Sequence, residues 1–414
     1  MGYSACRTGY NNGLERDQDA RRNSAKNDQE AGTLVQTVLT LLLAFGSTVL
    51  CVYLLKPLAP KLGLVDHPSG RKAHQGIVPL VGGIAIWLSL LISLLFIGMT
   101  GELMYLVAAG GLLVAVGAVD DAKDLPPAWR LVTQIAVAAI MCLFAGVSVQ
   151  TLGDLFVPGF DVRLGIFAIP FTIFAVVAII NAVNMSDGID GLCGTQVLIP
   201  LAGLAVLAGM KRDSEHFLPL VAISGCILGF LFFNLRTPWR SRARVFLGDS
   251  GSNLLGLILG WYLIDTSQGE NAVLAPVAVL WFAILLIYDT VEVVARRLLR
   301  RKSPFEAENE HLHHVFLLAG FSVSETVLSM GAITLLGVLV GILSSVIAIP
   351  DSAIFGAFIL FGLLFLRLIF RTWSVMRFLA RSICRRRGER RKVESSDWSG
   401  TSRRSGRDRR RSQS

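Results

Sequence analysis

Long apolar stretches separated by short polar loops follow one another through most of this sequence. A helix needs about 20 apolar residues to cross about 30 Å of bilayer hydrocarbon, and a helix also satisfies its own backbone polar groups there. Only 17% of the 414 residues are charged and 53% are hydrophobic, whereas soluble domains carry about 25% charged residues. So few polar groups could not cover a soluble core of this size. The sequence therefore predicts an all-α, polytopic integral membrane protein.

About eleven segments are candidates for membrane-spanning helices, and they define the domain organisation. The eighth and ninth segments contain acidic residues, so hydropathy defines their limits least well. We expect a polar extension at 1–33, a transmembrane domain at 34–375 and an Arg-rich, disordered tail at 376–414. The predicted segments are Leu34–Leu55, Ile77–Met99, Leu103–Val119, Leu131–Val147, Ile166–Ile180, Leu192–Met210, Phe217–Phe233, Val245–Ile264, Val273–Val294, Val327–Ile349 and Ala353–Phe370.

The distribution of Lys and Arg predicts the orientation in the membrane, because basic residues favour cytoplasmic loops. If the amino end is outside, the inside loops after segments 1, 3, 7 and 9 hold 4, 2, 4 and 5 basic residues, and the chain from Arg367 onward holds 16. The outside loops hold only Arg163, Lys211 and Arg212. One feature opposes this orientation, since the first 32 residues carry five basic residues, balanced by five acidic ones. The net charge of +9 is then a topology signal, and we expect no nucleic-acid partner.

Nearly all the unusual polar residues fall in loops on the predicted cytoplasmic face. Five loops converging on one side indicate a site, because structural charges would be scattered over both sides. The candidate residues are Arg71, Lys72, Asp120, Asp121, Arg130, Asn181, Asn184, Asp187, Asp190, Asp249, His311, His313 and His314.

The residue types in these loops indicate the chemistry. Two carboxylates about 4 Å apart repel by roughly 4 kcal/mol at an effective dielectric constant of 20, so several together require protonation or a bound cation. Asp and Asn oxygens suit Mg²⁺ or Mn²⁺. Arg and Lys beside such an ion favour a phosphate or diphosphate substrate. A transporter for a metal ion would need the carboxylates but not the arginines and histidines.

Three smaller patterns leave alternatives open. Gly188, Gly191, Gly248 and Gly251 permit either close approach to phosphate or helix packing, and their place beside the acids favours the site. Asp289 and Glu292 are equally compatible with a functional role and with ion pairs to Arg296 and Arg297. The histidines, spaced i, i+2, i+3, do not share one helix face, which favours a loop or strand-like segment.

The loops also carry a resemblance. VDDAKD with Arg130, NAVNMSDGIDGL, FLGDSGSN and SPFEAENEHLHH, in this order, resemble the polyprenyl-phosphate N-acetylhexosamine-1-phosphate transferases, glycosyltransferase family 4 of the MraY/WecA superfamily. DHPSGRKAHQGIVPLVGG is similar to the family's first cytoplasmic loop. The HLHH form resembles the WecA/TagO branch rather than the MraY branch. The resemblance covers about residues 34 to 375.

The resemblance implies a function: transfer of a sugar 1-phosphate, GlcNAc 1-phosphate first among the choices, from a UDP-sugar to undecaprenyl phosphate, with release of UMP. It implies Mg²⁺, or Mn²⁺, and a cytoplasmic-face active site in a bacterial inner membrane, as the first step of a cell-envelope glycan. UDP-MurNAc-pentapeptide and other UDP-N-acetylhexosamines are alternative substrates. A secondary transporter and an undecaprenyl-diphosphate phosphatase are more distant alternatives, and a homodimer is left open.

The resemblance also implies roles for individual residues. Asp249 and Asn184 would hold the metal. Asp120 and Asp121 would activate or position the lipid phosphate, while Asp187 and Asp190 would organise nucleotide and metal. The residues expected to bind substrate are Arg71, Lys72, Arg130, Asn181, Phe246, His311, His313 and His314.

Overall fold

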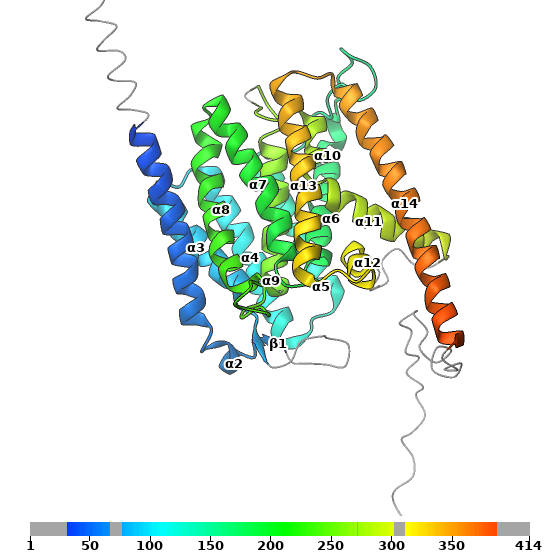
Figure 1. The fold of residues 1–414 in the computed structure, drawn as a ribbon. Helices are drawn as coiled ribbons and strands as arrows, with labels where there is room; N and C mark the ends of the chain where they lie inside the picture. Colours follow the sequence, from blue (N-terminus) through cyan, green and yellow to red (C-terminus); the bar gives the residue numbers. More distant parts are fainter. Residues whose placement is uncertain (1–30, 67–76, 271, 302–310, 387–414) are drawn as a thin grey trace, which may run out of the picture.

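The computed structural model describes residues 31–66, 77–270, 272–301 and 311–386, with side chains up to residue 372. Almost all secondary structure in these ranges is helical, and long helices stand side by side in a bundle (Figure 1). In chain order the elements are the helix Ala31–Leu55, α2 Ala59–Leu62, β1 Val65–Asp66, β2 Val78–Pro79, α3 Gly82–Ile97, α4 Gly101–Lys123, α5 Pro127–Phe144, the 3-10 helix η1 Gly165–Phe167, α6 Ala168–Ser186, α7 Leu192–Lys211, α8 Ser214–Asn234, α9 Gly248–Asp265, η2 Pro276–Ala278, α10 Val279–Phe282, α11 Ile284–Leu299, α12 Leu312–Leu318, α13 Val323–Val346 and α14 Asp351–Arg386.

Each of the eleven predicted segments overlaps helical structure, but fewer qualify as spans by length and hydropathy. Eight helices of the described residues are long and apolar enough to cross a membrane, or nine if one bent pair counts as a span. The protein is therefore an all-helical, multi-pass membrane protein, and a total of eleven spans stays a prediction. At the other end of the predicted domain, α14 continues to Arg386, past the expected boundary at residue 375.

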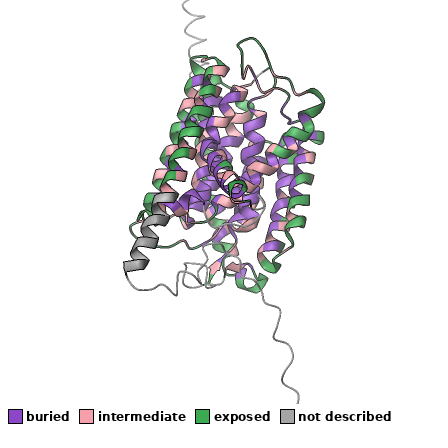
Figure 2. Cartoon of the chain, turned by 90° about the vertical axis from the view of Figure 1, so that its right-hand side faces the viewer, coloured by how far each residue is buried: buried purple, intermediate pink, exposed green. Residues whose placement is uncertain are grey.

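Helix α9 is not among these candidate spans because its sequence is too polar, and its burial inside the protein explains why it can be. All but its first two and last residues are buried, and it packs against α3, α4 and α6. Buried residues lie mostly in the middle of the bundle and exposed ones on its outside (Figure 2). A helix surrounded by protein needs no apolar exterior, so α9 can carry Gly, Ser, Asn and Asp in its first turns.

The ninth predicted segment is bent rather than straight. Pro276–Phe282 and Ile284–Leu299 meet at an angle of 76°, so α11 leaves the direction of the main bundle (Figure 1). Within α11, Arg296 Nη2 donates to Glu292 Oε2 at 2.7 Å, and both side chains are buried. Of the two alternatives for Glu292, the structure therefore shows the ion pair.

One small sheet departs from the all-α expectation. β1 and β2 pair antiparallel, and the chain after β2 pairs with Phe246 through a bridge from Leu80. The Phe246 N–H donates to Pro79 O at 2.9 Å, and the Phe246 carbonyl accepts from the Gly82 N–H at 3.0 Å. These bonds fix the segment before α9 to the start of α3.

Candidate active site

The first turn of α9 is wedged between α3 and α4, where glycines leave room for backbone contact. A Cβ on Gly83 of α3 would lie 2.7 Å from Ser250 C, and a Cβ on Gly117 of α4 would lie 2.5 Å from Ser250 N. Gly248 has φ +73°, a conformation that L side chains rarely adopt. The position of Asp249 in this turn is thus set by backbone packing from two sides.

Asp121, near the end of α4, caps α9 from outside that helix. Its Oδ1 accepts from the Asp249 N–H at 2.8 Å and its Oδ2 accepts from the Ser250 N–H at 3.3 Å. A carboxylate is favoured here because the amino end of a helix carries free N–H groups and partial positive charge. The geometry gives Asp121 a positioning contact with the backbone of Asp249.

Arg130, in the first turn of α5, joins two carboxylates. Its Nη1 lies 3.3 Å from Asp120 Oδ2 and 3.2 Å from Asp249 Oδ2. Asp120 is buried, and its Oδ1 accepts from the Leu125 N–H at 2.6 Å. Within the described part of the chain, the Oδ2 of Asp120 accepts no hydrogen bond, although it lies at ion-pair distance from Arg130.

Asn184, in the last turn of α6, contacts the other oxygen of Asp249. Its Nδ2 donates to Asp249 Oδ1 and to Ser252 Oγ, both at 2.8 Å. Asp187 is the residue directly after the last residue of α6. Solvent reaches the Asp187 side chain, yet the surrounding protein and the nearby carboxylates of Asp249 and Asp121 raise the pKa of Asp187 to about 7. Negative charge is concentrated around Asp249.

A chain of buried amides supports this centre. Asn181 Nδ2 donates to Gln134 Oε1 at 2.8 Å, and Gln134 Nε2 donates to Asn253 Oδ1 at 3.1 Å. Asn253 Nδ2 in turn donates to the carbonyl of Asp249 at 2.7 Å. Sequence analysis singled out Asn181 but missed Gln134 and Asn253, because a lone amide in an apolar helix gives no signal of its partner 119 residues away.

Asp190 lies in the same loop as Asp187 but has a structural partner. Its Oδ2 accepts from Arg236 Nε at 2.7 Å and from the Ala243 N–H at 3.1 Å. These bonds join the loop after α6 to the loop between α8 and α9. The geometry therefore supports a role for Asp190 in positioning that loop.

The three histidines begin a helix, contrary to the expectation of a loop or strand-like segment. His311 is the residue before α12, and His313 and His314 lie in its first turn. Asp289 of α11 contacts His311 Nδ1 at 3.0 Å and accepts from the Leu312 N–H at 2.7 Å. Asp289 thus orients a candidate residue and caps α12, whereas sequence analysis weighed it only as a functional acid or as a partner of arginine.

His313 brings this segment to the loop after α6. A Cβ on Gly188 would lie 2.6 Å from His313 Cε1, so only glycine leaves room for the ring. His313 is buried, and its Nε2 has no hydrogen-bond partner among the described residues. Burial and the neighbouring His314 and His311 lower the pKa of His313 to about 3. The ring is therefore neutral near pH 7.

Comparison with known proteins gives the family of this chain. Residues 103–267 match the family described as glycosyl transferase family 4. The undecaprenyl-phosphate alpha-N-acetylglucosaminyl 1-phosphate transferase of Escherichia coli K12 is 34% identical over 349 residues, which is 83% of this chain and 94% of that protein. The protein of the same name from Yersinia pestis is 34% identical over 358 residues, 86% of this chain and 98% of that protein. This chain belongs to glycosyl transferase family 4. The family match spans α4 to the end of α9 and so contains the residues gathered around Asp249.

The polar residues around Asp249 decide whether this family 4 protein can hold a metal ion. Among the described residues, no three His, Cys, Asp or Glu side chains converge closely enough to hold an ion. Asp249 and Asn184 are adjacent, however, and a half-turn of the Asn184 amide would present its oxygen beside the carboxylate. Carboxylate and amide oxygens are ligands that Mg²⁺ prefers. The donor chemistry fits a hard divalent cation.

The structure thus brings together Asp120, Asp121, Arg130, Asn184 and Asp249, and Asn181 is linked to Asp249 through the amides of Gln134 and Asn253. Phe246 lies just before α9, and its backbone is paired as described above. Arg71 and Lys72 lie outside the described residues. The assigned roles of all these residues stay predictions.

Proposed function

We propose that this protein transfers GlcNAc 1-phosphate from UDP-GlcNAc to undecaprenyl phosphate and releases UMP, on the cytoplasmic side of a bacterial inner membrane. The observation that carries the proposal is the gathering of Asp120, Arg130, Asn184 and Asp249 at the amino end of α9. The relatives named above are called transferases of this kind. The lipid-linked sugar phosphate would start a cell-envelope glycan.

The reaction is a single in-line displacement. An oxygen of the undecaprenyl phosphate attacks the β-phosphorus of UDP-GlcNAc, and the bond from that phosphorus to the bridging oxygen breaks. UMP leaves with that oxygen, and undecaprenyl diphospho-GlcNAc is formed. Positioning and charge neutralisation dominate such phosphoryl transfers.

Asp120 and Arg130 act on the acceptor phosphate. Asp120 Oδ2 takes the remaining proton of the phosphate, since this buried oxygen accepts no hydrogen bond in the described structure and makes a longer contact, of 3.3 Å, with Arg130. Arg130, now shared between two carboxylates, offers further N–H donors to phosphate oxygens. Asp121 keeps the first turn of α9, and with it Asp249, in place.

Asp249 and the Asn184 amide oxygen would hold Mg²⁺. When bound, the ion supplies positive charge that reduces repulsion between the two phosphorylated substrates. Asp187 is close enough for the charge of Asp249 to raise its pKa, and a cation bound there would favour the ionised form of Asp187.

The histidine segment binds the sugar phosphate. His311 is oriented by Asp289, and His313 is neutral, so its Nε2 can either donate or accept according to its tautomer. Phe246, Arg71 and Lys72 complete the proposed substrate contacts.

An isotope-exchange assay tests the proposal. Purified protein is given labelled UMP, unlabelled UDP-GlcNAc, undecaprenyl phosphate and Mg²⁺, and the label should enter UDP-GlcNAc only when both the lipid and Mg²⁺ are present. Exchange without the lipid would show that the reaction passes through a covalent enzyme intermediate and is not a single displacement. UDP-GlcNAc hydrolysis independent of the lipid, or no exchange, would refute the transferase.

A further inference from the structure

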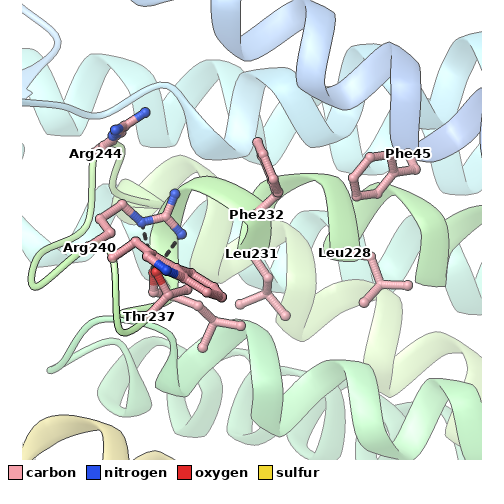
Figure 3. A pocket seen from close by; sticks show the side chains of 9 residues that line it. Phe45, Leu228, Leu231, Phe232, Thr237, Arg240 and Arg244 are labelled. Carbon is pink, nitrogen blue, oxygen red and sulfur yellow. Dashed lines mark hydrogen bonds between the residues drawn. The ribbon is translucent and has the colours of Figure 1, made fainter.

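A cavity of about 550 Å³, lined by none of the acidic residues around Asp249, lies between the helix Ala31–Leu55 and the carboxyl end of α8 (Figure 3). Its wall is apolar and includes Phe45, Leu228, Leu231 and Phe232. Both helices are candidate membrane spans, so this wall lies at the depth of lipid chains. Leu228 and Phe232 keep 40% and 56% of their surface exposed, so the described residues leave this part of the wall open.

The polar end of the cavity is formed by the loop between α8 and α9. Arg240 is fixed there, because its Nε and Nη2 donate to the carbonyl of Leu235 at 3.1 and 2.7 Å. Its guanidinium carbon lies 6.0 Å from the centre of the Phe232 ring. Arg244 lines the same end (Figure 3). Two cationic groups therefore stand where the apolar wall ends.

The described part of the protein places no carboxylate at ion-pair distance from these two charges. The loop 235–247 contains four arginines and no acidic residue. Arg236 pairs with Asp190, but within the described ranges neither Arg240 nor Arg244 has an acidic side chain at ion-pair distance. Burial and repulsion by Arg244 lower the pKa of Arg240. An anion bound at this end would relieve that repulsion.

We propose that the cavity binds an anionic phospholipid, with one acyl chain along the apolar wall and the phosphate at Arg240 and Arg244. A soluble phosphate would leave the apolar wall uncovered. A zwitterionic lipid would bring its own cation to an end that already holds two. Trp239, which lines the cavity and is 91% exposed, agrees with this position because indole side chains favour the membrane–water interface.

Occupancy would also affect the neighbouring centre. The loop that carries both arginines is joined to the loop after α6 through the bond from the Ala243 N–H to Asp190. A lipid held at Arg240 and Arg244 would restrain this loop and so stabilise the folded protein. Lipid binding at this cavity requires only that the protein lies in a membrane, so its test is independent of the proposed transferase activity.

Native mass spectrometry of the detergent-purified chain tests the site. The probes are palmitoyl-oleoyl phosphatidylglycerol and its phosphatidylcholine counterpart. We expect one tightly held phosphatidylglycerol per chain and about thirtyfold weaker binding in the double variant Arg240→Gln/Arg244→Gln, because each basic residue near an anionic lipid contributes on the order of a fivefold effect. The matched control, Arg242→Gln, changes an exposed arginine of the same loop that does not line the cavity, and should bind like the wild type.

A second variant guards against misfolding of the double variant. Leu228→Trp fills the apolar wall while both arginines remain, and it should weaken phosphatidylglycerol binding as well. Equal binding of phosphatidylcholine, equal loss in Arg242→Gln, or unchanged binding in Leu228→Trp would overturn the proposal. So would displacement of the lipid by millimolar inorganic phosphate, or retention of undecaprenyl phosphate alone, since either would assign the site to another ligand.

Discussion

Replacing Gly117 by alanine is a sharp test of how the centre is positioned. A Cβ at this residue would lie 2.5 Å from Ser250 N and 2.9 Å from Asp249 C, whereas ordinary contacts begin at 3.4 Å. Both obstructing atoms belong to the backbone, so the first turn of α9 must move by up to about 1 Å. A displacement of about 1 Å at a catalytic centre can lower the rate about 100-fold.

Stability should change much less than activity in this variant. Overpacking costs about 1–3 kcal/mol, but alanine is favoured over glycine inside a helix by about 0.5–1 kcal/mol. We therefore expect Gly117→Ala to fold, to lose a few degrees in Tm at most, and to lose about 100-fold in the rate of lipid-dependent transfer from UDP-GlcNAc.

The control is Gly356→Ala in α14, where nothing lies within 4 Å of the added Cβ. It should retain full transfer activity. If Gly117→Ala transfers within twofold of this control at unchanged Tm, close packing against α4 does not position Asp249, and the reasoning is refuted.

Three further predictions follow from individual contacts. Arg130→Gln, which removes the cation shared by two carboxylates, should lower kcat by about 10²–10³-fold, and an unchanged kcat would remove Arg130 from the reaction. Glu292→Gln replaces the carboxylate that is paired with Arg296 by a neutral amide and should lower the free energy of unfolding by about 1.5–3 kcal/mol; an unaltered Tm would contradict this. His313 has a folded-state pKa of about 3 against an ordinary 6.5, so the unfolded chain binds the extra proton and stability falls as pH drops below 6.5. The Tm of the wild type should therefore fall more between pH 7 and pH 5 than that of His313→Gln, and parallel curves would exclude the histidine.

The helical, multi-pass fold follows from the sequence because hydrocarbon imposes length and composition on every lipid-facing helix. That signal weakens where a helix is surrounded by protein. α9 carries Asp249, Ser250 and Asn253 in its first turns, and its burial depends on α3, α4 and α6, which hydropathy does not report. The bend before Ile284 was missed for a related reason, since apolar residues continue through it without a break.

The candidate centre was predictable as a set of residue types but not as a set of contacts. Asp and Asn in consecutive loops indicated a cation and phosphate, and the structure does place Asp120, Asp249 and Asn184 together. The partners that position them come from distant segments. Asp289 reaches His311, and Gln134 reaches Asn253, only because tertiary packing brings their helices together. No local spacing encodes these pairs.

The central claim is that Asp249 and Asn184 hold a divalent cation at the amino end of α9. Mn²⁺ can replace Mg²⁺ at oxygen ligands and reports its own binding by electron paramagnetic resonance. Titration of the purified protein should show one bound Mn²⁺ per chain, held more tightly with UDP-GlcNAc present. Asp249→Asn should weaken this binding strongly. The control Asp213→Asn changes the residue that caps the amino end of α8 and should bind Mn²⁺ like the wild type. Equal Mn²⁺ affinity in Asp249→Asn and the wild type would contradict the account.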